Sequence, residues 1–112
     1  MTIIDAPLNY LCSTSDVQPG CAKRIDLPDQ APVAVFNIDG RYFVTDDTCT
    51  HGEASLADGY IEDDIVECPY HQGTFNIQTG KPIGAPCTRP LKTYIAIVKH
   101  GGIHIAGTRS GE

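Results

Sequence analysis

The sequence predicts an all-β protein, and three observations support this class. No stretch of its 112 residues has helical periodicity over ten or more positions. Short β-branched and aromatic runs recur, separated by glycine, proline and aspartate. Two pairs of these runs are joined by aspartate-containing turns, which are typical of hairpins. We therefore expect small antiparallel sheets arranged as a sandwich or barrel.

The first half of the chain contains the clearest hairpin signal. Residues 1–20 mix apolar positions with turn formers, and 21–27 reads as a short strand. The runs 32–38 and 41–45 flank Asp39-Gly40, whose residues tolerate the positive φ angles of a tight turn. We expect this hairpin to lead directly into the segment that begins at position 46.

The second half predicts a further hairpin and two later strands. A second hairpin is expected at 60–62 and 65–67, and a short strand at 74–77. Residues 82–90 hold three prolines and are expected to be an ordered loop without regular structure. The most regular strand is predicted at 91–98, followed by a glycine turn and a last strand at 103–105.

Length and composition predict one domain over residues 1–112, with 106–112 as a flexible tail. The hydrophobic content of 41% is that of a globular protein. Residues 1–12 lack the pattern of a secretory signal, and no apolar run is long enough to cross a bilayer. A cytoplasmic location is expected, where the five cysteines would be kept reduced and available as ligands.

Two short segments each combine a cysteine with a histidine. One residue separates Cys49 from His51, sixteen residues follow, and two residues separate Cys68 from His71. A thiolate is a soft anionic ligand and a neutral imidazole is a borderline one. Two of each around iron or zinc form a chemically sensible ligand set. No other part of the sequence brings together so many metal-binding groups.

These two segments, 49–52 and 68–73, resemble the cluster-binding loops of Rieske-type [2Fe–2S] proteins. The size and surrounding sequence are similar to the Rieske ferredoxin components of bacterial aromatic ring-hydroxylating dioxygenases, over roughly residues 31–105. The resemblance implies one [2Fe–2S] cluster held by two loops at one tip of the fold. It assigns two ligands to each iron: Cys49 and Cys68 to one, and His51 and His71 to the other.

The resemblance also implies an electron carrier. Such a ferredoxin takes single electrons from an NADH-dependent flavoprotein reductase and passes them to a terminal Rieske oxygenase in the degradation of aromatic compounds. The sequence shows no nucleophile–base pair and no open metal position, so we expect an electron-transfer component and not an enzyme. We expect a monomer, with His51 and His71 as the exit for the electron.

Residues absent from the two loops predict a low reduction potential. High-potential Rieske proteins of respiratory complexes carry an extra cysteine in each loop, where this chain has Ala54 and Tyr70. They also offer Ser and Tyr hydroxyls near the cluster, where this chain has Gly73 and Phe75. Fewer hydrogen bonds to sulfur stabilise the reduced state less. We predict a potential on the order of −150 mV.

Two alternatives belong to other classes. One is the small Rieske-like subunit of an assimilatory nitrite reductase complex, although some of those subunits lack the cluster ligands that this chain retains. The other is a structural zinc module for protein interaction. Zinc loops usually space their cysteines as Cys-x-x-Cys before a helix, and neither feature is present. Colour would separate a red-brown Rieske protein from a colourless zinc protein.

The net charge of −6 is unevenly distributed. Between positions 42 and 80 there is no Lys or Arg. The same span holds eight acids: Asp46, Asp47, Glu53, Asp58, Glu62, Asp63, Asp64 and Glu67. An acidic surface disfavours nucleic acid and favours a basic protein partner. The alternative is a solvated surface that only aids solubility.

The remaining candidates have mainly structural interpretations. Three cysteines are left over and are expected to be small buried or half-buried side chains: Cys12, Cys21 and Cys87. His100 and His104 are expected on the surface, without a role in metal binding.

Glycine and proline in the loops leave two interpretations open. Gly52 and Gly73 could let backbone N–H groups approach the cluster sulfurs, or could serve as ordinary turn residues. Pro86 resembles the proline loop that covers the cluster in the family, or belongs to an ordinary surface loop.

Overall fold

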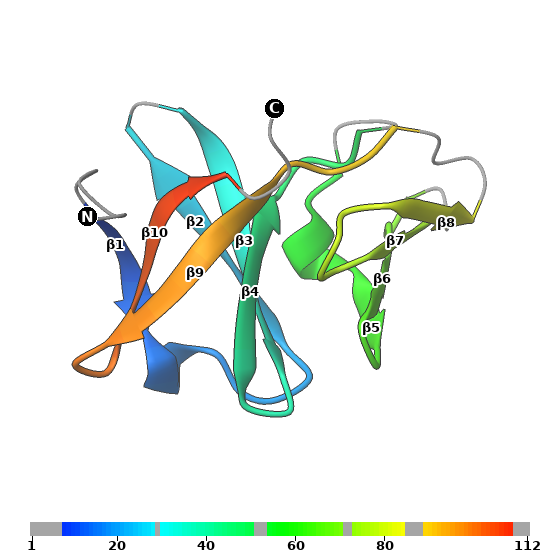
Figure 1. Cartoon of the computed structure of the whole chain (residues 1–112). Helices are drawn as coiled ribbons and strands as arrows, with labels where there is room; N and C mark the ends of the chain where they lie inside the picture. Colours follow the sequence, from blue (N-terminus) through cyan, green and yellow to red (C-terminus); the bar gives the residue numbers. More distant parts are fainter. Residues whose placement is uncertain (1–7, 29, 51–53, 71–72, 85–88, 109–112) are drawn as a thin grey trace.

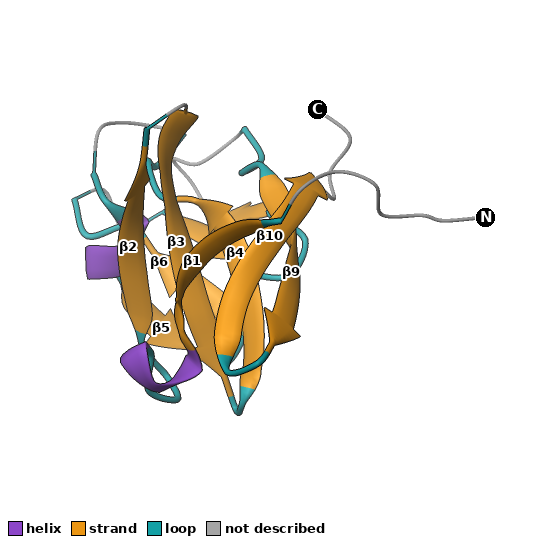
Figure 2. Ribbon diagram, turned by 90° about the vertical axis from the view of Figure 1, so that its left-hand side faces the viewer, coloured by secondary structure: helices purple, strands orange, loops and turns teal. Residues whose placement is uncertain are grey.

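Ten strands form two antiparallel sheets in the computed structural model, which describes residues 8–28, 30–50, 54–70, 73–84 and 89–108. The six-stranded sheet has the order β1 (Asn9–Ser13), β10 (Gly102–Thr108), β9 (Thr93–Lys99), β4 (Arg41–Asp46), β3 (Gln30–Ile38) and β2 (Ala22–Leu27). The four-stranded sheet has the order β5 (Tyr60–Glu62), β6 (Ile65–Glu67), β7 (Thr74–Asn76) and β8 (Pro82–Gly84). The large sheet is strongly curved, and the small sheet lies beside it (Figures 1 and 2).

The predicted all-β class is confirmed. The helical elements of the described residues are two short 3-10 turns, η1 (Thr14–Asp16) and η2 (Leu56–Asp58). No helix in this part of the chain is both long enough and apolar enough to span a bilayer. The fold is therefore built from strands and turns, as the short apolar runs predict.

Both predicted hairpins are present, and each turn contains an aspartate with positive φ. Asp39 has a φ of 55° and is followed by Gly40 at 88°, between β3 and β4. Asp63, also at 55°, lies between β5 and β6. Aspartate adopts this left-handed region more readily than most residues, because its short polar side chain can bond locally.

Strand β3 is buried on both faces and separates two hydrophobic cores. Val33 and Val35 pack with Leu11, Val44 and Ile103 inside the curve of the large sheet. The alternate residues Ala34 and Phe36 face a second core. A run of consecutive apolar residues is typical of a strand without a solvent face, and this explains why the segment 32–38 does not alternate with polar residues.

The second core lies between the large sheet and the small one. Its buried members are Ala34, Phe36, Cys49, Ala54, Leu56, Val66, Cys68, Phe75, Ile77 and Leu91. These residues come from both hairpins and from the segments that follow them. The small sheet alone has strands of three residues each, so it depends on this shared core for its stability.

Two predictions from the sequence are wrong in detail, and one strand is not predicted at all. The segment 1–20 contains strand β1, which pairs with β10 through Asn9 and Ile105. Residues 82–84, expected in an irregular loop, form β8 and pair with β7. Strand β10 continues to Thr108, three residues into the predicted tail. Strands β1 and β8 lie at sheet edges, and β10 is extended by its pairing with β9. Local composition does not reveal such pairing.

Candidate metal centre

The first candidate cysteine lies at the base of a loop whose two sides are joined by backbone hydrogen bonds. The N–H of Leu56 donates to the carbonyl of Asp47 at 2.7 Å, and the N–H of Cys49 donates to the carbonyl of Ala54 at 3.0 Å. Strand β4 ends at position 46, so this base continues the β3–β4 hairpin. The hairpin therefore fixes where the backbone of Cys49 lies, as the sequence predicts.

The second candidate cysteine has the same arrangement in the small sheet. Strands β6 and β7 pair at Glu67 and Thr74, and the connection between them begins at Cys68. The N–H of Cys68 donates to the carbonyl of Gly73 at 2.8 Å. In both loops the cysteine amide thus bonds to the carbonyl five residues further along. Gly73 contributes its carbonyl to the loop base, a role that any residue could fill, so both interpretations of this glycine stay predictions.

Both cysteine side chains are buried in the same core. Cys49 is 2% exposed and Cys68 is 1% exposed, and both belong to the core between the two sheets. Neither cysteine forms a disulfide with another described residue. Two buried thiols in one apolar cluster, each at the base of a closed loop, suit a shared soft metal group that must be shielded from water.

The two candidate histidines lie outside the described residues. In the sequence His51 follows Cys49 by two positions, and His71 follows Cys68 by three. Among the described residues, no group of three or more Cys, His, Asp or Glu side chains is placed to hold a metal ion. The two cysteines therefore need further ligands, and the histidines remain the predicted ones.

A third segment is attached to the first loop. The hydroxyl of Thr50 donates to the carbonyl of Arg89 at 2.7 Å, 39 positions away in the sequence. The N–H of Leu91 in turn donates to the carbonyl of Gly80 at 2.8 Å. The chain on the C-terminal side of the proline-rich loop is thereby held against both ligand-bearing parts of the fold. Pro86 itself lies outside the described residues.

The positions used to predict a low potential have the expected character. Ala54 is buried and Tyr70 is 74% exposed, and neither residue carries a thiol that could form a disulfide between the two loops. Phe75 is fully buried in the shared core, where it offers no hydroxyl. The described part of the site thus supplies apolar surroundings to the two cysteines.

Two of the eight predicted surface acids have structural roles instead. Asp47 is 1% exposed, and its carboxylate accepts the N–H of Ala57 at 2.9 Å. Asp46 accepts the hydroxyl of Tyr94 at 2.5 Å. Burial, together with this hydrogen bond to Asp46, raises the pKa of Tyr94 well above its usual value. The acidic surface is therefore smaller than the sequence suggests, because charge alone does not reveal an inward-facing carboxylate.

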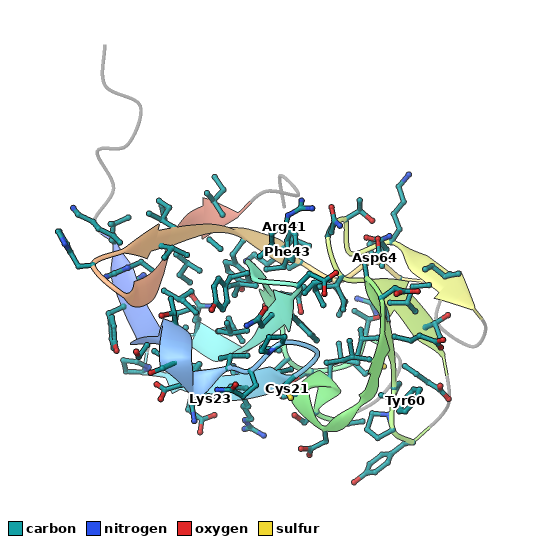
Figure 3. The ribbon with its side chains drawn as sticks, turned by 90° about the horizontal axis from the view of Figure 1, so that it is seen from below. Cys21, Lys23, Arg41, Phe43, Tyr60 and Asp64 are labelled. Carbon is teal, nitrogen blue, oxygen red and sulfur yellow. The ribbon has the colours of Figure 1, made fainter. Side chains whose placement is uncertain are left out.

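The acids that do reach solvent belong to the small sheet and to η2, which directly precedes it. Asp58, Glu62 and Asp63 are exposed, while Asp64 and Glu67 are half-buried. Glu53 lies outside the described residues. Figure 3 shows Asp64 and Tyr60 on the small-sheet side of the molecule, and Cys21 and Lys23 at the β2 edge of the large sheet.

A shallow hollow of about 340 Å³ opens beside the second cysteine. Its lining includes Asp58, Tyr60, Glu67, Cys68 and Pro69. Tyr60 is 68% exposed, so an aromatic ring stands in the acidic surroundings. This combination of carboxylates and an exposed ring suits a cationic side chain of another molecule.

The leftover cysteines divide between core and surface. Cys12 is buried in the core of the large sheet, where burial, with a smaller contribution from Asp16, raises the pKa of its thiol. It is the small buried side chain that the sequence predicts. Cys21 is exposed, so the same prediction is wrong there. Cys87 lies outside the described residues.

The two extra histidines also differ from each other. His100 is exposed in the β9–β10 turn, as predicted. His104 is half-buried, and its ring packs edge-on against Tyr10 with the ring centroids 5.4 Å apart. The prediction of a surface histidine is thus only partly correct for His104. Its position on β10, next to the missed strand β1, accounts for the difference.

An all-β scaffold that buries two cysteines at the bases of two matching loops, each followed in the sequence by a histidine, suits a metal-cluster protein. The description "Rieske [2Fe-2S] domain" belongs to the family model that matches residues 8–95, and the chain belongs to this family. The family carries one [2Fe–2S] cluster. The apolar burial and the soft donor pair at positions 49 and 68 fit that group.

Individual relatives narrow the class further. Ferredoxin CarAc from Metapseudomonas resinovorans is 43% identical over 99 residues, covering 88% of this chain and 92% of its own. The 3-phenylpropionate/cinnamic acid dioxygenase ferredoxin subunit of Escherichia coli (strain K12) is 44% identical over 97 residues, covering 86% and 90%.

A solved structure gives the same result at the level of the backbone. It is described as a complex of reduced oxygenase and oxidized ferredoxin in carbazole 1,9a-dioxygenase. The matching chain superposes with a TM-score of 0.87 at 42% identity, over 94% of this chain and 97% of that one.

These comparisons confirm the resemblance inferred from the two loops. The chain is a Rieske-type ferredoxin, similar to those of aromatic-ring dioxygenase systems, and it is an electron-transfer component rather than a complete enzyme. They favour this class over the nitrite reductase subunit and the zinc module.

Proposed function

We propose that Cys49 and Cys68 hold one iron of a single [2Fe–2S] cluster and that His51 and His71 hold the other. The observation that carries this assignment is the pair of buried thiols at the bases of two loops with the same Cys N–H to carbonyl hydrogen bond. When bound, the cluster supplies a one-electron redox centre. The protein side supplies two anionic ligands, two neutral ones and a dry apolar wall.

We infer that the protein carries single electrons from an NADH-dependent flavoprotein reductase to the Rieske centre of a terminal oxygenase in aromatic compound degradation. A related chain has been solved with its oxygenase in the carbazole system, which supports an oxygenase as one partner. The two relatives are named for different systems, carbazole and phenylpropionate. The proposal therefore stops at the class of aromatic-ring dioxygenases.

The same reasoning extends to the reduction potential, the oligomeric state and the cellular location of the protein. We propose a low-potential carrier that acts as a monomer in the cytoplasm. Support comes from the four described cysteines, which form no disulfide with one another, and from the absence of hydroxyls at Phe75 and Gly73.

Substitution of single ligands tests the assignment. Cys68→Ser and His71→Ala should each abolish the visible absorption and the rhombic [2Fe–2S] electron paramagnetic resonance signal of the dithionite-reduced protein. Two iron atoms per chain are expected in the native protein, bound without zinc. Cys21→Ser and His100→Ala change the same residue types at exposed positions and should retain the full signal. A wild-type protein that is colourless and binds zinc would contradict the proposal.

We further propose that the acidic hollow beside Cys68 docks a basic surface of the reductase. The carboxylates of Asp58 and Glu67 flank the exposed ring of Tyr60, and Glu62 and Asp63 continue the acidic surface along the hairpin. Opposite charges would speed encounter and bring the partner next to one cluster ligand.

Two aspartates with the same backbone conformation provide a matched test of docking. Asp63→Asn and Asp39→Asn remove the same charge at a φ of 55°, one in the small-sheet hairpin and one in the large-sheet hairpin. Asp63→Asn should slow reduction by the reductase several-fold at low salt and have little effect at high salt. Asp39→Asn should leave the rate unchanged. Equal rates for both variants would favour a surface that serves only solubility.

A further inference from the structure

Among the described residues, Asp47 is the one acidic side chain that is buried. It is 1% exposed, whereas the other buried polar side chains are the neutral Asn37, Thr45 and Thr93. A carboxylate loses favourable hydration when it is buried, so a fold retains one only where its partners or its function compensate. The partners of Asp47 therefore determine how far its buried charge is compensated.

Among the described residues, the carboxylate of Asp47 has one hydrogen bond and one distant cation. Its Oδ1 accepts the N–H of Ala57 at 2.9 Å, which holds the second residue of η2. Its Oδ2 lies 4.0 Å from Nε of Arg24. That same Nε donates to Oδ1 of the exposed Asp26 at 3.0 Å, so the closer partner of the guanidinium is Asp26. The charge of Asp47 is therefore only weakly compensated.

The backbone directs this side chain to the same interior as the first cysteine ligand. Asp47, where the chain bends, and Cys49 are both buried, while Thr48 between them is exposed. Thr48 forms an antiparallel bridge with Ser55, which holds this exposed residue at the base of the loop. Residues two apart in a chain are separated by at most about 7 Å.

We infer that Asp47 is a positioning residue for the cluster and sets its reduction potential. This rests on the proposed ligand role of Cys49. The hydrogen bond to Ala57 holds the base of the first loop against η2, and the carboxylate places a fixed negative charge beside that loop. Reduction adds one electron to the site, and a nearby buried negative charge opposes it more strongly than a charge in water would. Asp47 therefore favours the oxidised protein and keeps the potential low.

The variant Asp47→Asn separates charge from geometry. Asparagine has nearly the same size and keeps an oxygen that can accept the N–H of Ala57, but it carries no charge. The holoprotein should retain its absorption and electron paramagnetic resonance spectra. Its potential, measured by voltammetry at one fixed pH, should rise by at least the equivalent of a tenfold change in the redox equilibrium, about 59 mV for one electron.

The exposed neighbour gives a matched control. Asp26→Asn removes the same charge from the other partner of Arg24, at a site where water screens it. Its potential should differ from that of the wild type by less than a third of the shift seen for Asp47→Asn. Equal shifts for the two variants would overturn the inference, and so would an unchanged potential in Asp47→Asn.

A third variant keeps the test decisive if Asp47→Asn does not fold. Arg24→Gln removes the half-exposed cation that faces Asp47 and leaves the carboxylate in place. Its potential should fall, in the opposite direction, and an unchanged or higher value would contradict the inference. Failure of the ligand assignment is recognised separately, because the wild-type protein would then lack the [2Fe–2S] signal altogether.

Discussion

The two sheets of this protein are stabilised by different means. The large sheet has strands of five to nine residues and encloses its own core of valine, isoleucine, leucine and tyrosine. The small sheet has four strands of three residues, and its buried side chains belong to a core that contains Cys49 and Cys68. The core of the large sheet contains none of the candidate ligands, and the core of the small sheet is built around two of them.

This difference means that the two sheets have different sources of stability. Short strands contribute few ladder hydrogen bonds and little apolar burial, so the small sheet has little stability of its own. A metal group bound by residues from both regions adds its binding free energy to folding. We therefore expect the small sheet to depend on the cluster and the large sheet to be much less sensitive to it.

Removal of iron should give the largest effect on this comparison. In the apoprotein, amide hydrogen exchange at Val66 and Phe75 should accelerate by about 100-fold or more, because the binding free energy of the cluster no longer stabilises their strands. Exchange at Val35 and Val44, in the large sheet, should change by less than about tenfold. Hydrogen exchange followed by mass spectrometry or NMR measures both sets in one sample.

The apoprotein experiment has a clear contrary outcome. Uniform acceleration in both sheets would mean that the protein unfolds as one cooperative unit. Unchanged exchange at Val66 and Phe75 would mean that packing against Phe36 and Leu91 is sufficient to hold the small sheet. Reconstitution with iron and sulfide should restore the original pattern, which separates loss of the cluster from damage to the chain.

The sequence predicts the parts of the fold that are locally encoded. Asp39-Gly40 and Asp63-Asp64 predict their hairpins because the turn residues must tolerate positive φ. The double burial of 32–38 is visible as an uninterrupted apolar run. Strands β1 and β8 were missed because their pairing partners are distant in sequence or lie beyond a turn. Edge strands of mixed composition carry no signal of this kind.

The candidate site shows the same limit. The paired Cys/His segments predict the metal centre, and the structure places both cysteines in one core. The hydrogen bond from the Thr50 hydroxyl to the Arg89 carbonyl joins residues that are 39 positions apart. No local sequence pattern predicts such a contact. The sequence does not show that the side chain of Asp47 is buried, because a carboxylate is normally found on the surface.

Alkaline pH should act first on the large sheet, through Tyr94, with a smaller effect than iron removal. Its hydroxyl donates to Asp46 at 2.5 Å and accepts from Gln30 at 3.0 Å. An unfolded tyrosine loses its proton near pH 10, while burial and the bond to Asp46 keep the folded pKa of Tyr94 well above that value. Above about pH 10 the folded state therefore binds one more proton than the unfolded state, so stability falls as pH rises, by up to about 1.4 kcal/mol per unit.

The variant Tyr94→Phe should be less stable at pH 8 by about 1–3 kcal/mol, because Asp46 and Gln30 lose their partner. It should then lose less stability than the wild type between pH 10 and 11 in urea unfolding of the holoprotein. Tyr60→Phe, an exposed control on the small sheet, should follow the wild-type slope. A wild-type slope in Tyr94→Phe would show that other groups account for the alkaline loss.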